Sequence, residues 1–221
     1  MLIEDKPMLL KAIEMILAST QSIQKKTDDT YIRYEKKYPK NTHEENQHLV
    51  ADKIIGYYSN KAALIGGATS MSSIVPGIGT VMAMFGGATA DTAMSMKYQI
   101  EMSMALAHLY GQDITVEEQK RICMIVAGLG TMTELSKKGA REVGEKAFTA
   151  LMEKTLKEST RQTVIQLFKR LGIELTQKSM KKAIPFGVGI VVSIGVNKVV
   201  TKYVGSKAKA YYQQFTGKNN D

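Results

Sequence analysis

The side chains of this chain that could perform acid-base, nucleophilic or metal chemistry are few and scattered. The three histidines are His43, His48 and His108. The first two do not form the H-E-x-x-H zinc motif, because a spacing of five residues turns their imidazoles about 140° apart on a helix. Cys123 is the only cysteine and stands among apolar residues, which is typical of an inert buried thiol. The sequence therefore predicts no catalytic residue, no metal site and no cofactor.

Glycine-rich strings could cradle a phosphate group, but none here has the required pattern. A Walker loop ends in Gly-Lys followed by Ser or Thr, and the chain contains no such string. The segment GIGTVMAMFGG lacks the G-x-G-x-x-G spacing, and GLGTMTELSKKG follows no strand pattern. A nucleotide site is therefore not expected.

Residues 62–90 form a run of 29 residues without a charged side chain, which is long enough for a transmembrane helix. Its composition argues against a span, because 12 of the 29 are glycine, serine or threonine, whose transfer into lipid gains little free energy. Pro76 also divides the run into halves of about 20 Å each, at ~1.5 Å per residue. We expect two short helices joined at Pro76-Gly77 and packed through small side chains. The sequence does not decide whether these helices are surrounded by other helices in water or by lipid.

A second uncharged run near the C-terminus has the same features as the first. Each run is expected to expose a proline-glycine tip to a bilayer surface or a partner. These two tips are Pro76-Gly77-Ile78-Gly79 and Pro185-Phe186-Gly187. Two polar residues nearby, Asp91 and Asn197, are predicted to be buried. Asp91 could pair with a lysine, cap a helix, or serve as a proton or cation site.

The net charge of +9 is unevenly distributed along the chain. Residues 1–60 hold nine basic and nine acidic residues, whereas residues 131–221 hold 17 and seven. Such a field attracts anionic lipid headgroups, nucleic acid or an acidic protein. Lys198, Lys202 and Tyr203 suit a membrane surface, where lysines snorkel and tyrosines lie at headgroup depth. Glutamates interleaved with the basic clusters of residues 134–158 make nucleic acid the less favoured partner, and an ordinary solvated surface is the plain alternative.

The composition, rich in methionine and alanine and without tryptophan, favours helices. Apolar spacing predicts a helix from Pro7 to about Gln24, followed by a polar connection that Pro39 interrupts. Thr42-His43-Glu44-Glu45 has the pattern of a capping box that begins the next helix. We therefore expect an all-α, single-domain helical bundle with central hairpins rich in glycine and small residues.

Four motifs follow one another between residues 66 and 113: Gly66-Gly67-Ala68-Thr69, Pro76-Gly77, Asp91 and Tyr110-Gly111-Gln112-Asp113. In this order they resemble the EcsC family of bacterial proteins, named after a protein encoded alongside an ABC transporter. The closing run with Asn197 is also similar to that family. The resemblance covers residues 45–215; residues 1–44 would be an N-terminal helix and connection, and 216–221 a frayed tail. It implies a helical fold and membrane association but no established activity, and Ser72-Ser73 makes this copy less lipophilic.

The expected function is that of a non-enzymatic accessory protein, cytoplasmic and peripheral to the inner membrane. Acidic residues at the N-terminus and the single cysteine fit a chain without a secretory signal in a reducing compartment. Its partner would be an anionic membrane surface or a membrane protein. Two alternatives stay open: a pore-forming, toxin-delivery or immunity component whose hairpins insert into lipid, and a protein that binds an apolar ligand or lipid. The sequence does not predict the oligomeric state.

Overall fold

The computed structural model describes residues 6–65, 75–135, 144–157, 160–181 and 189–216. Within these ranges the chain forms nine α-helices and no strand, so the predicted all-α class is confirmed. The helices are α1 (Met8–Ile16), α2 (Thr20–Lys37), α3 (His43–Ala63), α4 (Ile78–Phe85), α5 (Gly87–Leu109), α6 (Glu117–Leu135), α7 (Glu145–Thr155), α8 (Thr160–Lys181) and α9 (Gly189–Gln213).

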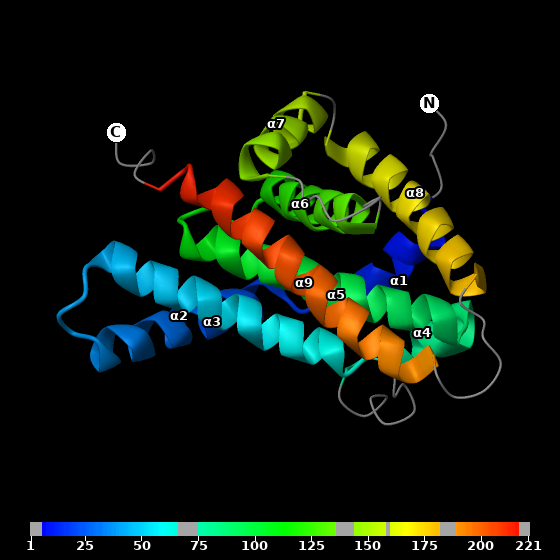
Figure 1. Cartoon of the computed structure of the whole chain (residues 1–221), viewed down its shortest axis with the longest axis horizontal. Coiled ribbons are helices and arrows are strands. Elements are labelled where there is room, and N and C mark those ends of the chain that lie inside the picture. Colours follow the sequence, from blue (N-terminus) through cyan, green and yellow to red (C-terminus); the bar gives the residue numbers. More distant parts are fainter. Residues whose placement is uncertain (1–5, 66–74, 136–143, 158–159, 182–188, 217–221) are drawn as a thin grey trace.

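Helix α5 is the centre of the bundle. It packs against α1, α2, α3, α4, α6 and α9. Figure 1 shows the long helices α3 and α9 lying side by side across α5, with α6, α7 and α8 together at the top of the view. Helix α1 packs against α4, α5 and α8, so it shares the bundle even though the family resemblance begins only at residue 45.

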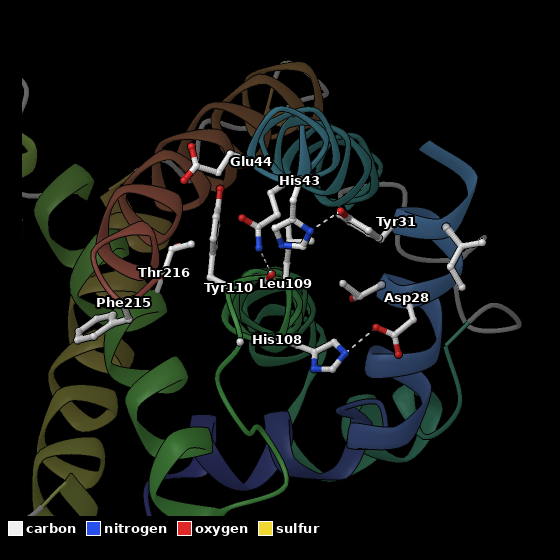
Figure 2. Close-up of a pocket in the computed structure, with 13 residues that line it drawn as sticks. Asp28, Tyr31, His43, Glu44, His108, Leu109, Tyr110, Phe215 and Thr216 are labelled. Atoms are coloured by element: carbon white, nitrogen blue, oxygen red, sulfur yellow. Dashed lines mark hydrogen bonds and ion pairs between the residues drawn. The ribbon is translucent and has the colours of Figure 1, made fainter. Parts of the chain in front are cut away.

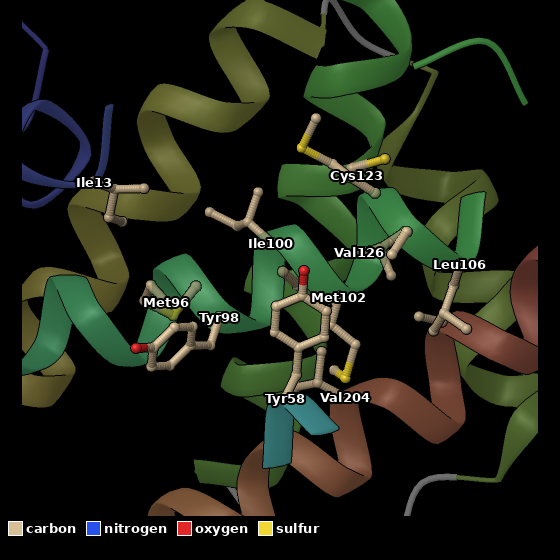
Figure 3. Packing of buried hydrophobic residues seen from close by; sticks show 14 of the residues in the cluster. Ile13, Tyr58, Met96, Tyr98, Ile100, Met102, Leu106, Cys123, Val126 and Val204 are labelled. Atoms are coloured by element: carbon tan, nitrogen blue, oxygen red, sulfur yellow. The ribbon is translucent and has the colours of Figure 1, made fainter. Parts of the chain in front are cut away.

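All residues of α5 from Met96 to Ala107 are buried, and several of them are polar. Buried polar groups cost free energy unless they are hydrogen-bonded. Here their partners come from distant helices: Thr131 of α6 donates to Gln99, and the hydroxyls of Ser103 and Tyr212 lie 3.2 Å apart. Figure 3 shows apolar side chains from neighbouring helices, among them Tyr58 and Val204, closing around α5. These polar pairs fix which helices can lie against α5.

Small residues allow the closest helix contacts of the bundle. A Cβ atom on Gly205 would lie 2.9 Å from side-chain atoms of both Ile55 and Met102, and one on Gly130 would lie 3.1 Å from Val204. A larger side chain at either glycine would push α9 away from its neighbours. Close packing through small residues therefore occurs in α6 and α9, whereas three of the four described glycines of the segment for which it was predicted would have no atom within 4 Å of an added Cβ.

The N-terminal region differs from the sequence prediction. The expected single helix from Pro7 to Gln24 is interrupted, since α1 ends at Ile16 and α2 begins at Thr20. Ser19 caps α2 by accepting a hydrogen bond from the Ser22 amide, and the Glu101 carboxylate accepts one from the Ala18 amide at 2.8 Å. The prediction that the following polar segment is a connection is also wrong, because α2 continues to Lys37. Only a narrow side of α2 is buried, so its apolar periodicity is too weak to reveal a helix.

The capping box at the start of α3 is confirmed. The Thr42 hydroxyl accepts from the Glu45 amide at 3.2 Å, and the Thr42 amide donates to the Glu45 carboxylate at 2.7 Å. Two backbone amides of the first turn are thereby satisfied. This local motif could be read correctly because both partners lie within four residues.

The predicted central hairpin is described only in part. Pro76-Gly77 leads into α4, and a second break at Gly86, with φ of +82°, separates α4 from α5. The residues before the turn, 66–74, lie outside the described ranges. The uncharged run therefore contains an additional turn, because glycine at position 86 adopts a left-handed conformation that other residues rarely adopt.

Lys97 and Glu101 lie one turn apart on α5 and form a buried ion pair. Their side chains are only 8% and 6% exposed, and Glu101 Oε1 contacts the Lys97 ammonium as well as the Ala18 amide. Removal of one member of such a pair leaves an uncompensated charge inside the protein, which is costly even where the intact pair contributes little. The pair also links α5 to the turn between α1 and α2.

We expect Glu101→Ala to lower the free energy of unfolding by about 3–5 kcal/mol, because Lys97 and the Ala18 amide both lose a buried partner. The matched control is Glu117→Ala, which removes the exposed pair with Lys120 and should cost less than about 1 kcal/mol. Urea unfolding followed by far-UV circular dichroism measures both. Equal losses in the two variants would contradict the structural role of the Lys97–Glu101 pair.

Candidate functional site

The first predicted tip lies against the bundle. Pro76, Gly77 and Gly79 are exposed, whereas the Ile78 side chain is buried at 4% exposure and belongs to the core. Gly77 has φ of +83°, and a Cβ on it would lie 3.1 Å from the Met15 carbonyl oxygen at the end of α1. The tip therefore exposes backbone and proline but no large apolar side chain. The second predicted tip, Pro185-Phe186-Gly187, falls outside the described residues.

The predicted surface of α9 is divided between solvent and core. Lys198 and Lys202 are exposed on successive turns, but Tyr203 is 7% exposed and turns inward. The ammonium of Lys207, also buried, lies 5.1 Å from the centroid of the Tyr203 ring. Tyr203 therefore stabilises the interior of the bundle and is not an interfacial residue.

Asp91 and Asn197, predicted to be buried polar residues, are both half-buried. Burial raises the pKa of the Asp91 carboxyl above its ordinary value. No lysine or arginine of the described ranges forms an ion pair with it. The lysine pairing foreseen for Asp91 is thus not seen in this part of the chain.

Lys198 and Lys202 line a groove of about 720 Å³ between α3 and α9. The third lysine of the groove, Lys209, donates to Asp52 at 2.7 Å, whereas no carboxylate of the described residues pairs with Lys198 or Lys202. The groove also contains the exposed carboxylate of Glu145. Two ammonium groups on this face of α9 are therefore available to an external anion.

Exposed apolar side chains accompany these lysines. Val199 lies between them on α9 and is 59% exposed, and Leu64 at the end of α3 is 64% exposed. Met84 of α4 is 62% exposed. These are among the most exposed large hydrophobic residues of the described chain. Apolar side chains beside unpaired lysines form a surface of mixed character.

A larger cavity, of about 890 Å³, lies between α2, α3 and the end of α5 (Figure 2). Two of the three histidines point into it, and each is oriented by a residue of α2. His108 Nε2 lies 2.8 Å from the Asp28 carboxylate, and His43 Nδ1 lies 2.6 Å from the Tyr31 hydroxyl. Burial and the nearby Glu35 raise the pKa of Tyr31, so the phenol keeps its proton and can donate to His43. The cavity is thus lined by two imidazoles whose orientation is fixed by side chains of α2.

The sequence did not predict this cavity. Asp28 and Tyr31 are three residues apart on α2 and so share one side of that helix, but this region was interpreted as a connection. Their partners lie 80 and 12 residues further along the chain. The only usable indication was the helical spacing of Asp28, Tyr31 and Ile32, which is too short a pattern to recognise without the tertiary contacts.

Neither a metal site nor a membrane span is found among the described residues. These residues contain no group of three or more His, Cys, Asp or Glu side chains placed to hold a metal ion. None of the helices, within the same limits, is long and apolar enough to cross a membrane.

Comparison with models of known protein families found no match, and neither did comparison with curated proteins or with solved structures. The resemblance to the EcsC family therefore stays a prediction. Function has to be argued from the surfaces of this chain itself.

Cys123 is fully buried, and burial raises the pKa of its thiol to about 12. Because the thiolate is the reactive form, we expect the folded protein to react with an aromatic disulfide reagent at least about a thousandfold more slowly than a free cysteine. A time course of thiol release measures this rate. The double variant Cys123→Ser/Ser206→Cys, with its cysteine on the exposed side of α9, should react as a free thiol does. Fast reaction of the folded wild type would contradict the burial.

Proposed function

We propose that this protein is a non-enzymatic, peripherally associated membrane protein of the cytoplasm that binds an anionic lipid surface, at the inner membrane, through the exposed side of α9. The observation that carries the proposal is the pair Lys198 and Lys202, which lie on successive turns of α9 without a carboxylate partner in the described chain. Each basic residue near an anionic membrane surface contributes about 1 kcal/mol of attraction.

The exposed apolar side chains favour a lipid surface over a purely polar binding partner. Val199 lies between the two lysines along α9, is exposed, and could enter the headgroup region while the ammonium groups contact phosphates. Tyr203 faces inward and is not available as an aromatic anchor, so lysines and aliphatic residues make the proposed contact. Such an interface is shallow and depends strongly on salt.

Vesicle flotation tests the proposal. We expect the protein to float with vesicles of phosphatidylcholine and phosphatidylglycerol at low salt, to be released at high salt, and to remain unbound with phosphatidylcholine alone. The double variant Lys198→Glu/Lys202→Glu should weaken binding about 30-fold or more, since two favourable charges are lost. Equal binding to neutral and anionic vesicles would contradict an electrostatic surface.

The matched control is Lys36→Glu/Lys37→Glu, which makes the same change in net charge at exposed positions of α2. It should retain most of the binding. Dye release from the same vesicles separates this proposal from a pore-forming function: a peripheral protein leaves the vesicles sealed, whereas insertion of the hairpins would release the dye.

A further inference from the structure

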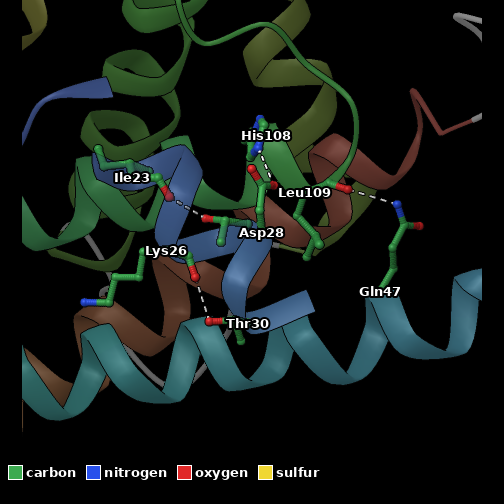
Figure 4. A network of polar contacts seen from close by, with 8 residues as sticks. Ile23, Lys26, Asp28, Thr30, Gln47, His108 and Leu109 are labelled. Atoms are coloured by element: carbon green, nitrogen blue, oxygen red, sulfur yellow. Dashed lines mark hydrogen bonds and ion pairs between the residues drawn. The ribbon is translucent and has the colours of Figure 1, made fainter. Parts of the chain in front are cut away.

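A second groove, of about 400 Å³, lies between α2 and α3 on the other side of α2 from the histidine cavity. We call it the α2–α3 groove. Figure 4 shows how α2 separates the two: Asp28 extends toward His108, whereas Lys26 extends in a different direction. Of these two recesses, the α2–α3 groove is lined by lysine and arginine, whereas the described lining of the histidine cavity includes neither.

The α2–α3 groove concentrates positive charge. Its described lining includes four cationic side chains and one carboxylate, that of Asp29; the cations are Lys25, Lys26, Arg33 and Lys53. None of the four cations forms an ion pair with another described residue. Like charges brought together raise the free energy of the folded state unless an anion offsets them. The first 60 residues carry equal numbers of acidic and basic residues, so this excess is created by the fold.

Tyr57 gives the groove a directed hydrogen-bonding group. The Lys26 ammonium donates to the Tyr57 hydroxyl and lies 4.0 Å from the centroid of its ring, and Lys61 lies 4.9 Å from the same centroid. Burial alone would raise the pKa of Tyr57, but the hydrogen bonds and charges of the two lysines outweigh it and lower the pKa. The phenol accepts from lysine, and its own O–H is therefore left to donate to an anion.

The floor of the groove is apolar. Ile23, Ile54 and Ala105 form its base with little open surface, at 2%, 7% and 2% exposure, and the half-buried rings of Tyr34 and Tyr57 supply the apolar surface that stays open to the groove. A fully hydrated inorganic ion would leave this floor uncovered. A body of hydrocarbon or an aromatic ring would cover it, at about 25 cal/mol for each Å² removed from water.

We infer that the α2–α3 groove binds a small amphiphilic anion, whose apolar body lies on the floor and whose carboxylate or phosphate is held by Lys26, Lys53 and Arg33 at the rim. The volume falls within the ~300–1,000 Å³ of small-molecule sites, which combine apolar walls with a few polar groups. A free fatty carboxylate and a phosphate-bearing lipid fragment share this chemistry.

Isothermal titration calorimetry with water-soluble probes tests the inference. Decanoate and decyl phosphate supply the two anionic groups, decanol lacks the charge, and inorganic phosphate lacks the apolar body. We expect saturable binding of at least one amphiphile and at least tenfold weaker binding of decanol and inorganic phosphate. Shorter chains should bind more weakly, by up to about fourfold for each methylene removed. A preference for decanoate or for decyl phosphate identifies the source of the anion.

The variant Lys26→Gln/Lys53→Gln should weaken amphiphile binding at least tenfold while the far-UV circular dichroism spectrum stays that of the wild type. Its matched control, Lys36→Gln/Lys37→Gln, removes two exposed charges of α2 outside the groove and should bind normally. Lys198→Glu/Lys202→Glu should also bind normally, because this assay contains no membrane and the site is independent of the proposed α9 surface.

Three results would overturn the inference. They are the absence of saturable binding by both amphiphiles, equally tight binding of decanol, and equal losses in the groove variant and its α2 control. The first would leave the four cations to a larger acidic partner, the second would show an apolar site without charge selection, and the third would show a nonspecific charge effect.

Discussion

The burial of α5 is the constraint on which the rest of this structure depends. A helix covered on every side must find a partner for each of its polar side chains, because an unsatisfied group in the interior costs about 1–3 kcal/mol. Glu101 meets this demand by accepting hydrogen bonds from Lys97 and from the Ala18 amide, 83 residues earlier in the chain. That one carboxylate thereby fixes where α1 ends and where α2 begins. Gln99 and Ser103 fix α6 and α9 in the same way.

The position of α2 follows from this arrangement and gives the molecule two chemically different recesses. On one side of α2, Asp28 and Tyr31 orient two histidines in a cavity whose described lining includes no lysine or arginine. On the other side, Lys26 and Arg33 join Lys53 of α3 around an apolar floor. A segment with balanced charge in the sequence thus separates its charges across one helix, since helical geometry sends residues two apart to opposite sides.

Helix α9 separates its side chains by the same geometry. Lys198 and Lys202 face outward beside Val199, whereas Tyr203 and Tyr212 are buried. Gly205 lets α9 approach α3 and α5, and this close contact holds the basic side of the helix in place. The aromatic residues therefore stabilise the bundle, and any contact with an anionic surface depends on the lysines and the aliphatic side chains between them.

The sequence by itself determined the all-α class, the capping box that begins α3, the uneven charge and the absence of familiar catalytic motifs. These features depend on composition or on residues within a few positions of one another. Only the tertiary structure decided that the polar segment after Ser19 is a helix, that Tyr203 faces inward, and that His43 and His108 share one cavity. The reason is that the periodicity of a helix shows which of its sides is apolar, whereas the helix that covers that side is chosen by contacts between residues far apart in the chain.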